Sequence, residues 1–372
     1  MSESESGESV VIGAQLKKAR ELLQLLPEEV ASELNVARKD VLDWEEEQTQ
    51  PTLKQLEDLG RLYGREIDYF LRETPPPPSK IEFRGRPAQS LGELSRPARV
   101  VLARFDELCR TALEFENLLN KERQVKLPHF GESDYPRTAA RTMREQLDVG
   151  SKPLPNLRQR LETEGLRIFE LPVPEDAFSG FSFWHSKYGP SVLLNASDLV
   201  GRKNFTLAHE LAHLLYEHTP TLCYIPIKLS EVRGHTEFRA NQFAAEFLLP
   251  EAGVLEDLRR RDLPQSPSQK ELGQIAGKWG VSIQALGYRL ENLGRIQSGY
   301  TDTLFELQPR FFRRSRTPKW RKRLGERFVE TTFEAYERGV ISAGKVAGGL
   351  GIPIREAMKE IEQRSKSKAD AL

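Results

Sequence analysis

The sequence is poor in cysteine, since only Cys109 and Cys223 occur among its 372 residues. Two distant cysteines exclude both a disulfide scaffold and a zinc module built on four thiolates. The sequence also lacks an uninterrupted apolar run of the roughly 18 residues that a membrane helix needs. Its first residues, MSESESGESVV, are acidic and polar, unlike a secretion signal. We therefore expect a cytoplasmic protein with no membrane segment.

An excess of charge of one sign is missing as well, because 55 basic residues balance 55 acidic ones. Total charge thus indicates neither a nucleic acid nor a membrane as partner, and local blocks matter more. The clearest block is RFFRRSRTPKWRKRLGER, residues 310–327, in which Glu326 is the one acid. With its interleaved aromatic residues it could bind nucleic acid by charge and stacking. A solvated helix face, or a surface for an acidic partner, is the alternative interpretation.

Length and patterning together predict a mainly α protein with a small β-sheet, in two or three domains. Residues 11–72 carry a dense helical pattern, and the four prolines of ETPPPPSK that follow predict a stiff spacer. An apolar stripe of helical period over residues 97–125 predicts one long amphipathic helix that packs or dimerises. Three strands are expected further on, in the segments GLRIFEL, GFSFWHSKYG and PSVLLNAS.

The segment NFTLAHELAHLLYEHTP, residues 204–220, carries the strongest chemical signal. Positions i and i+4 of a helix share one face, so His209 and His213 can aim both imidazoles at one point, while Glu210 faces aside. This is the H-E-x-x-H spacing, in which two histidines bind zinc and the glutamate serves as base. A pair of partly buried histidines satisfied by hydrogen bonds is the structural alternative.

A catalytic zinc ion needs a third protein ligand, and Glu237 of the helix EFRANQFAAEFLL is the best candidate. Phe238 and the later apolar residues of that helix are expected to pack against the motif helix and so present Glu237 to it. Asn241, one turn on, could orient one of the ligands by a hydrogen bond. Glu246 is the alternative ligand. For the group that stabilises the oxyanion, Tyr224, His235 and Tyr288 all stay open.

Several of these segments together resemble the ImmA/IrrE family of metallopeptidases over about residues 150–297. They are LRIFELPVPEDAFSGFSF, PSVLLNAS, RKNFTLAHELAHLL, EFRANQFAAEFLLP and GVSIQALGYRLENLGRI. The resemblance implies that His209, His213 and Glu237 bind Zn²⁺ and that Glu210 is catalytic. It also implies a protein substrate, a helix-turn-helix transcriptional repressor, in a stress or mobile-element response.

The N-terminal helical segment is similar to Xre/Cro-type helix-turn-helix domains, notably in VASELNV and VLDWEEEQTQPTLKQLEDLGRLYG. In that fold the third helix, about residues 38–46, would enter the major groove. Candidate DNA contacts are the polar and basic residues Arg38, Lys39, Gln48 and Gln50. Pro27 stands where the family usually has glutamine, and the acids Asp43, Glu45, Glu46 and Glu47 would repel phosphates. Docking of a protein is therefore the alternative role.

The expected domain order follows from these segments. It comprises an Xre-type domain at 1–73, a Pro-rich linker at 74–96, a helical connector at 97–149, a zincin-like α+β peptidase domain at 150–260, a helix-turn-helix-like subdomain at 261–300 and a basic helical region at 301–372. The favoured function is a zinc endopeptidase fused to a helix-turn-helix domain. Two alternatives remain: a DNA-binding regulator whose peptidase-like domain is a sensor, and an antitoxin-like regulator. A homodimer through the helix at 97–125 is a further expectation.

Overall fold

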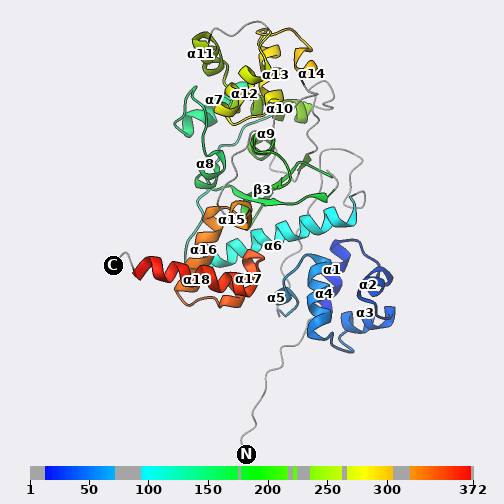
Figure 1. Cartoon of the computed structure of the whole chain (residues 1–372). Helices are drawn as coiled ribbons and strands as arrows, with labels where there is room; N and C mark the ends of the chain where they lie inside the picture. Colours follow the sequence, from blue (N-terminus) through cyan, green and yellow to red (C-terminus); the bar gives the residue numbers. More distant parts are fainter. Residues whose placement is uncertain are drawn as a thin grey trace, which may run out of the picture. The chain divides into compact units, whose positions relative to one another are not determined.

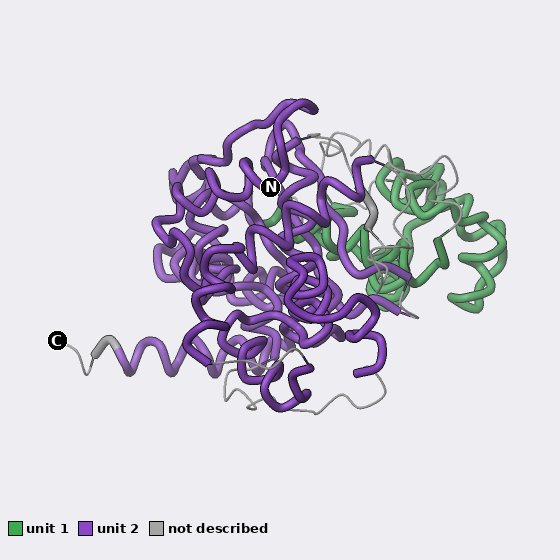
Figure 2. The backbone as a smooth tube through the Cα atoms, turned by 90° about the horizontal axis from the view of Figure 1, so that it is seen from above, with its two compact units in different colours: residues 1–81, 88–111 green, residues 82–87, 112–372 purple. Residues whose placement is uncertain are grey.

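The computed structural model of the chain describes residues 13–71, 94–174, 177–216, 221–223, 235–261, 266–304 and 319–369. These residues form mainly helices and one small β-sheet, as the sequence predicts (Figure 1). Among the described helices, none combines the length and the apolar character that crossing a membrane requires. The chain forms two compact units, residues 1–81 with 88–111 and residues 82–87 with 112–372 (Figure 2).

Five short helices account for most of the described part of the first unit. They are α1 (Gly13–Leu22), α2 (Pro27–Leu34), α3 (Arg38–Glu45), α4 (Leu53–Tyr63) and α5 (Ile67–Phe70). Their apolar sides meet in one core, which includes Val30, Trp44 and Phe70. The side chain of Thr52 accepts a hydrogen bond from the Gln55 amide and so begins α4. The dense helical pattern expected over residues 11–72 is confirmed by these helices.

The first unit also includes the first turns of α6 (Arg96–Leu118), so its boundary lies later than the expected position at residue 73. Buried charge explains this difference. Nη1 of Arg65 lies 3.0 Å from the carboxylate of Asp106 and 3.1 Å from that of Glu107, both on α6. A buried guanidinium needs such partners, and these acids, in the middle of α6, therefore tie the part of α6 up to Thr111 to the five helices.

In the second unit the strands are β1 (Arg167–Leu171), β2 (Gly180–His185), β3 (Gly189–Asn195) and β4 (Thr221–Cys223), in the order β1-β3-β2-β4. β1 runs parallel to β3, and β2 is antiparallel to both β3 and β4. The three expected strands are confirmed as β1, β2 and β3. The short edge strand β4 was not expected, since three residues give too little pattern.

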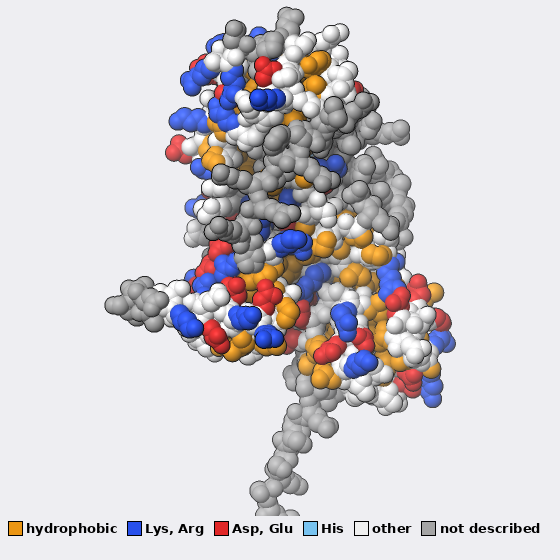
Figure 3. Space-filling view, viewed as in Figure 1, with side chains coloured by type: hydrophobic (Ala, Val, Ile, Leu, Met, Phe, Trp, Pro, Cys, Tyr) orange, Lys and Arg blue, Asp and Glu red, His pale blue; other side chains and the backbone are white. Residues whose placement is uncertain are grey.

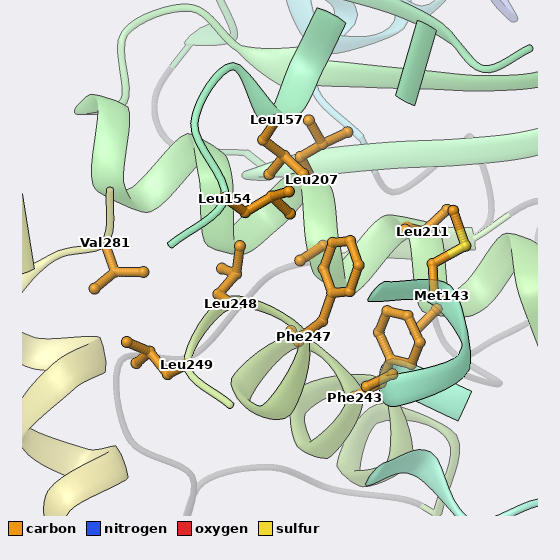
Figure 4. Packing of buried hydrophobic residues seen from close by; sticks show 14 of the residues in the cluster. Met143, Leu154, Leu157, Leu207, Leu211, Phe243, Phe247, Leu248, Leu249 and Val281 are labelled. Atoms are coloured by element: carbon orange, nitrogen blue, oxygen red, sulfur yellow. The ribbon is translucent and has the colours of Figure 1, made fainter. Parts of the chain in front are cut away.

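One face of the sheet is covered by α9 (Val200–Tyr216), which carries the H-E-x-x-H segment. Every residue of α9 from Thr206 to Tyr216 is buried, so this part of the helix is enclosed rather than amphipathic. Next to it lie α10 (His235–Leu248), α7 (Pro136–Gln146) and α8 (Leu157–Thr163). Figure 4 shows Phe243 and Phe247 of α10 in the same cluster as Met143 of α7 and Leu211 of α9. α11 (Glu251–Arg261), α12 (Gln269–Trp279), α13 (Ile283–Asn292) and α14 (Tyr300–Thr303) complete this part.

The opposite face of the sheet packs against the C-terminal helices. These are α15 (Lys319–Leu324), α16 (Glu326–Glu337), α17 (Ala343–Leu350) and α18 (Ile354–Ala369). Phe328 of α16 stacks on Phe115 of α6, with ring centroids 6.2 Å apart, and meets Phe169 of β1 edge-on at 5.4 Å. Packing inside the chain therefore accounts for the apolar stripe at the end of α6, which ends near Asn120, a residue with φ of 52°.

Charged side chains of both signs lie next to one another on parts of the face drawn in Figure 3. On the face in Figure 3, blue and red side chains alternate over the regions of α1–α4 and of α16–α18. This distribution agrees with the equal numbers of basic and acidic residues in the sequence.

Candidate metal centre

Two helices bring three side chains that could hold a metal ion to one point. His209 and His213 lie one turn apart on α9, and Glu237 lies in the first turn of α10. Their ligand atoms all lie within 4.8 Å of one another. Nε2 of His209 is 3.2 Å from the Glu237 carboxylate, and Nε2 of His213 is 3.5 Å from it. The two imidazoles are fully enclosed, whereas the Glu237 side chain is 23% exposed.

Asn241 fixes the orientation of the first imidazole. Its Oδ1 lies 2.9 Å from Nδ1 of His209, and both residues are buried. An amide oxygen only accepts hydrogen bonds, so Nδ1 of His209 donates and carries the proton. Nε2 of His209 then keeps its lone pair and points toward His213 and Glu237, which is the tautomer that a metal ligand requires.

The donor set fits a divalent cation. The Nε2 atoms of His209 and His213 are only 3.0 Å apart. Two lone pairs at that distance repel each other unless a proton or a cation lies between them, and the Glu237 carboxylate adds negative charge. Two imidazole nitrogens and one carboxylate form the ligand set of one class of catalytic zinc site, which leaves a position for water. The three residues are therefore suited to hold zinc.

Glu210 is held by the sheet rather than by the metal-binding side chains. The hydroxyl of Ser182 on β2 donates a hydrogen bond of 2.6 Å to Oε2 of Glu210, and both residues are completely buried. Gly180 lies two residues earlier, on the same face of β2. A Cβ atom at Gly180 would lie 2.6 Å from Oε1 of Glu210 and 2.5 Å from the Thr206 side chain. Strand β2 therefore binds the Glu210 carboxylate through Ser182 and leaves room for it by having no side chain at Gly180.

Sequence comparison agrees with this geometry. Residues 161–291 match the family model of the IrrE N-terminal-like domain, a peptidase family. The matched IrrE-like segment contains the metal-binding cluster, Glu210 and the strand that carries Ser182. It covers about a third of the chain, and it supports a metallopeptidase-like function for this part of the protein. A comparison of the whole chain with curated proteins finds no match.

The alternative ligand, Glu246, has a different role in the IrrE-like segment. Its buried carboxylate forms ion pairs with Arg289 and, at 3.2 Å, with Arg141. Phe238 was expected to pack against the motif helix, but this prediction is wrong because its side chain is 49% exposed. Phe243 and Phe247, which are fully buried, provide the expected packing instead.

The structure places two of the three candidates for oxyanion stabilisation. The Tyr288 hydroxyl donates a 2.8 Å hydrogen bond to Asp302, and His235 is an exposed residue at the start of α10. Tyr224 lies outside the described residues. Ser182 and Gly180 were missed at the sequence level. They stand in the GFSF segment, whose only signal was its β pattern.

The predicted DNA-binding residues of the first unit are all exposed. Arg38 and Lys39 open α3, and Gln48 and Gln50 follow it. Arg38 forms a solvent-exposed ion pair of 2.5 Å with Glu28, and the amide of Gln48 donates to a neighbouring backbone carbonyl. An exposed pair of this kind contributes little stability and is easily exchanged for another anion.

The acids at the end of α3 require a correction. Glu45 was expected near phosphates, but it is buried and binds the Arg20 guanidinium through contacts of 2.6 and 2.8 Å. The exposed Glu47 accepts a 2.8 Å hydrogen bond from the Gly13 amide at the start of α1. The fold thus uses two of the acids that the sequence suggested would repel DNA.

The basic block at 310–327 is described only from Lys319 onward. In that part, Arg321 forms ion pairs with Glu326, Glu330 and Glu360 at 2.9, 3.4 and 3.5 Å. Nη1 of Arg327 donates to a backbone carbonyl of α8. These basic residues therefore take part in packing the C-terminal helices.

Proposed function

We propose that the chain is a zinc-dependent endopeptidase in which His209, His213 and Glu237 hold the metal and Glu210 is the general base. The observation that carries this proposal is the convergence of three ligand atoms within 4.8 Å beside a buried glutamate. The match of residues 161–291 to a peptidase family supports it. A purely structural histidine pair would explain neither the Glu237 carboxylate beside the two imidazoles nor the hydrogen bond from Ser182 that holds Glu210.

The chemistry divides between the ion and the chain. When bound, zinc supplies a Lewis acid that polarises a carbonyl and makes water acidic enough to lose a proton near neutral pH. The Glu210 carboxylate would accept this proton through one oxygen and pass it to the leaving amine. Ser182 holds the other oxygen, Oε2, by its 2.6 Å hydrogen bond and so limits the rotation of the carboxylate. The bond lines up the base before substrate binds.

The proposed substrate is a protein, and the resemblance noted in the sequence suggests a helix-turn-helix repressor. The proposal includes regulated proteolysis in a stress or mobile-element response, inside the cytoplasm.

Metal analysis of the purified chain is the first test. We expect about one zinc ion per chain in the wild type and in Glu210→Gln, and a large loss in His213→Ala, because only the last change removes a ligand. The second test compares new protein N-termini in cells that produce the wild type with those in cells that produce Glu210→Gln. Cleavage products that persist in the Glu210→Gln cells would contradict the role of this residue.

A DNA-binding function of the first unit is the second candidate. It is favoured by the exposure of Arg38 and Lys39 at the start of α3 and by the burial of Glu45, which forms an ion pair with Arg20 and so does not face DNA. Under this hypothesis the IrrE-like segment is a sensor. Regulation would therefore persist in Glu210→Gln and would be abolished by Arg38→Ala combined with Lys39→Ala. Under the peptidase hypothesis, Glu210→Gln by itself abolishes regulation.

A further inference from the structure

The same turn joins two helices at three places in the chain. It links α2 to α3, α12 to α13 and α17 to α18. In each case the first helix ends at a residue in the left-handed region, namely Asn35, Gly280 and Gly351, with φ of 54°, 68° and 63°. The residue after it is apolar, and one further residue precedes the second helix. The first two of these pairs were expected from the sequence to be helix-turn-helix units, whereas the third was not.

Hydrogen bonds and burial follow the same register in all three pairs. The amide of the apolar turn residue donates to the carbonyl of an alanine five positions earlier, at 3.0 Å each time. These donor and acceptor pairs are Val36 and Ala31, Val281 and Ala276, and Ile352 and Ala347. The residue before each alanine is completely buried. At the matching position of each second helix, five residues after the apolar turn residue, the side chain is exposed by 2% or less. These residues are Val41, Leu286 and Ala357. Residues 342–369 therefore form a third helix-turn-helix unit.

The outer side of the second helix is covered in the α12–α13 pair. Gly287 of α13 faces Thr301 of α14 so closely that an added Cβ would lie 2.5 Å from the threonine hydroxyl. Glu291 accepts hydrogen bonds of 2.9 and 2.7 Å from the amides of Gly299 and Thr301. This pair is thus a packing element, and α13 cannot enter a DNA groove without loss of α14.

The outer side of α18 is open in the described part of the chain. Ile354, Arg355, Met358 and Lys359 are exposed within its first two turns. Arg355 and Lys359 form no ion pair with any described residue. In Figure 3, blue and orange side chains lie together over the region of α17 and α18, with red ones between them. Basic and apolar side chains at the start of a second helix suit phosphate oxygens and thymine methyl groups.

Two acids of α18 are turned to the protein interior. Oε1 of Glu356 accepts a 2.8 Å hydrogen bond from the Trp320 indole, and Glu360 lies 3.5 Å from the Arg321 guanidinium. Both partners belong to α15. The intramolecular contacts thus take up negative charge on one side of α18 and leave Arg355 and Lys359 on the other. Over the first two turns of α18 the open side therefore carries positive charge, which complements DNA, and the third acid of the helix, Glu362, is exposed one turn further on.

We propose that the unit at 342–369 binds double-stranded DNA, with α18 in the major groove and with Arg355 and Lys359 on phosphates. This site is separate from the metal centre and from α3, and it does not rest on the peptidase proposal. It would allow the second unit to contact DNA by itself.

The test measures the binding of a fluorescent mixed-sequence DNA duplex to the full-length chain over a range of salt concentrations. All variants carry Arg38→Ala and Lys39→Ala, which remove the predicted contacts of α3. The test variant adds Arg355→Ala and Lys359→Ala. The matched control instead adds Arg259→Ala and Arg260→Ala, two exposed arginines of α11. Circular dichroism of each variant checks that the helices are intact.

We expect the test variant to bind more weakly and the control to bind like its parent. Loss of two phosphate contacts should reduce the slope of log K against log salt by about 1.8, at roughly 0.9 for each contact. Equal affinity and equal slope in the test and control variants would overturn the proposal. A parent that binds no duplex at low salt would overturn it too.

Discussion

Replacement of Asn241 by alanine should weaken zinc binding although no ligand is removed. The change deletes the Oδ1 atom that lies 2.9 Å from Nδ1 of His209. His209 is completely buried and Asn241 is only 3% exposed, so water has no direct access to replace the acceptor. The imidazole would then lose the group that sets its tautomer and its orientation. The proton could shift to Nε2, which would block the metal-binding nitrogen.

The expected size of the effect follows from the role of such outer hydrogen bonds. Removal of a partner of a ligating histidine typically lowers metal affinity about 10- to 100-fold. This range corresponds to about 1.4–2.8 kcal/mol of binding free energy. The loss of a buried hydrogen bond alone has a similar cost, about 1–3 kcal/mol. Both routes give the same order of magnitude, so a measurable change is expected.

The assay is competition for zinc between the chain and a chromophoric chelator at neutral pH. Asn241→Asp keeps an acceptor oxygen and should retain tight binding, which separates a hydrogen-bond effect from a loss of packing. Gln242→Ala changes the neighbouring residue of α10 and should leave zinc affinity unchanged. An Asn241→Ala chain that binds zinc as tightly as the wild type would refute the assigned role of Asn241.

Three further predictions concern the hydrogen bond that holds Glu210, the aromatic contact of the C-terminal helices and one buried carboxylate. Ser182→Ala should lower the rate of substrate cleavage about 10- to 100-fold, as expected for loss of a hydrogen bond to a charged group, while the zinc content stays at the wild-type value. Phe328→Ala should lower the free energy of unfolding by about 3–5 kcal/mol, measured by urea denaturation, because it empties a site between two aromatic rings. Burial raises the pKa of Glu116, but hydrogen bonds and charge from two arginines outweigh burial and hold this pKa below its ordinary value. The stability from Glu116 is therefore complete above the ordinary value of about 4.3 and is lost as the pH falls through the lower pKa, so the unfolding free energy should fall over that interval.

Each of these has a control in the chain. Ser191→Ala changes a serine of β3 that is equally buried, and it should leave cleavage intact. Phe328→Leu should recover part of the stability that Phe328→Ala loses, since it refills the site in part. Glu116→Gln should flatten the acid limb of the stability curve. A Ser182→Ala chain with lower zinc content would show that this serine supports the fold of the site rather than the base.

Local features of the site were predictable from sequence, and long-range features were less so. The spacing of His209 and His213 is a property of one helix, so the pattern alone places both imidazoles on one side. Glu237 required the further assumption that a second helix packs on the first, and the apolar residues that follow Glu237 in the sequence made this assumption reasonable. Ser182 could not be predicted, because its contact with Glu210 depends on which strand lies under α9 and on which residues of that strand face the helix.

The domain boundary and the exposure of α18 escaped prediction for a related reason. A proline-rich segment predicts where a chain is extended, but the ion pairs of Arg65 with α6 decide which helices belong together. Likewise, the sequence of α18 intersperses its acids with its bases and does not show which of them face solvent. The contacts of Glu356 and Glu360 with α15 determine which of them stay on the surface.

The burial of the metal centre argues for function rather than stability. His209 and Glu210 are completely buried and His213 is 1% exposed, in a helix whose other buried residues are mainly leucine and alanine. Apolar side chains of similar volume at these positions would often be neutral or stabilising, since ionisable groups lose solvation when they are buried. The Glu210 carboxylate is nevertheless kept here by a hydrogen bond from Ser182, and the lack of a side chain at Gly180 leaves space for it. Local departures from the best packing are expected at functional sites, and this one coincides with three side chains, those of His209, His213 and Glu237, that could hold a metal ion.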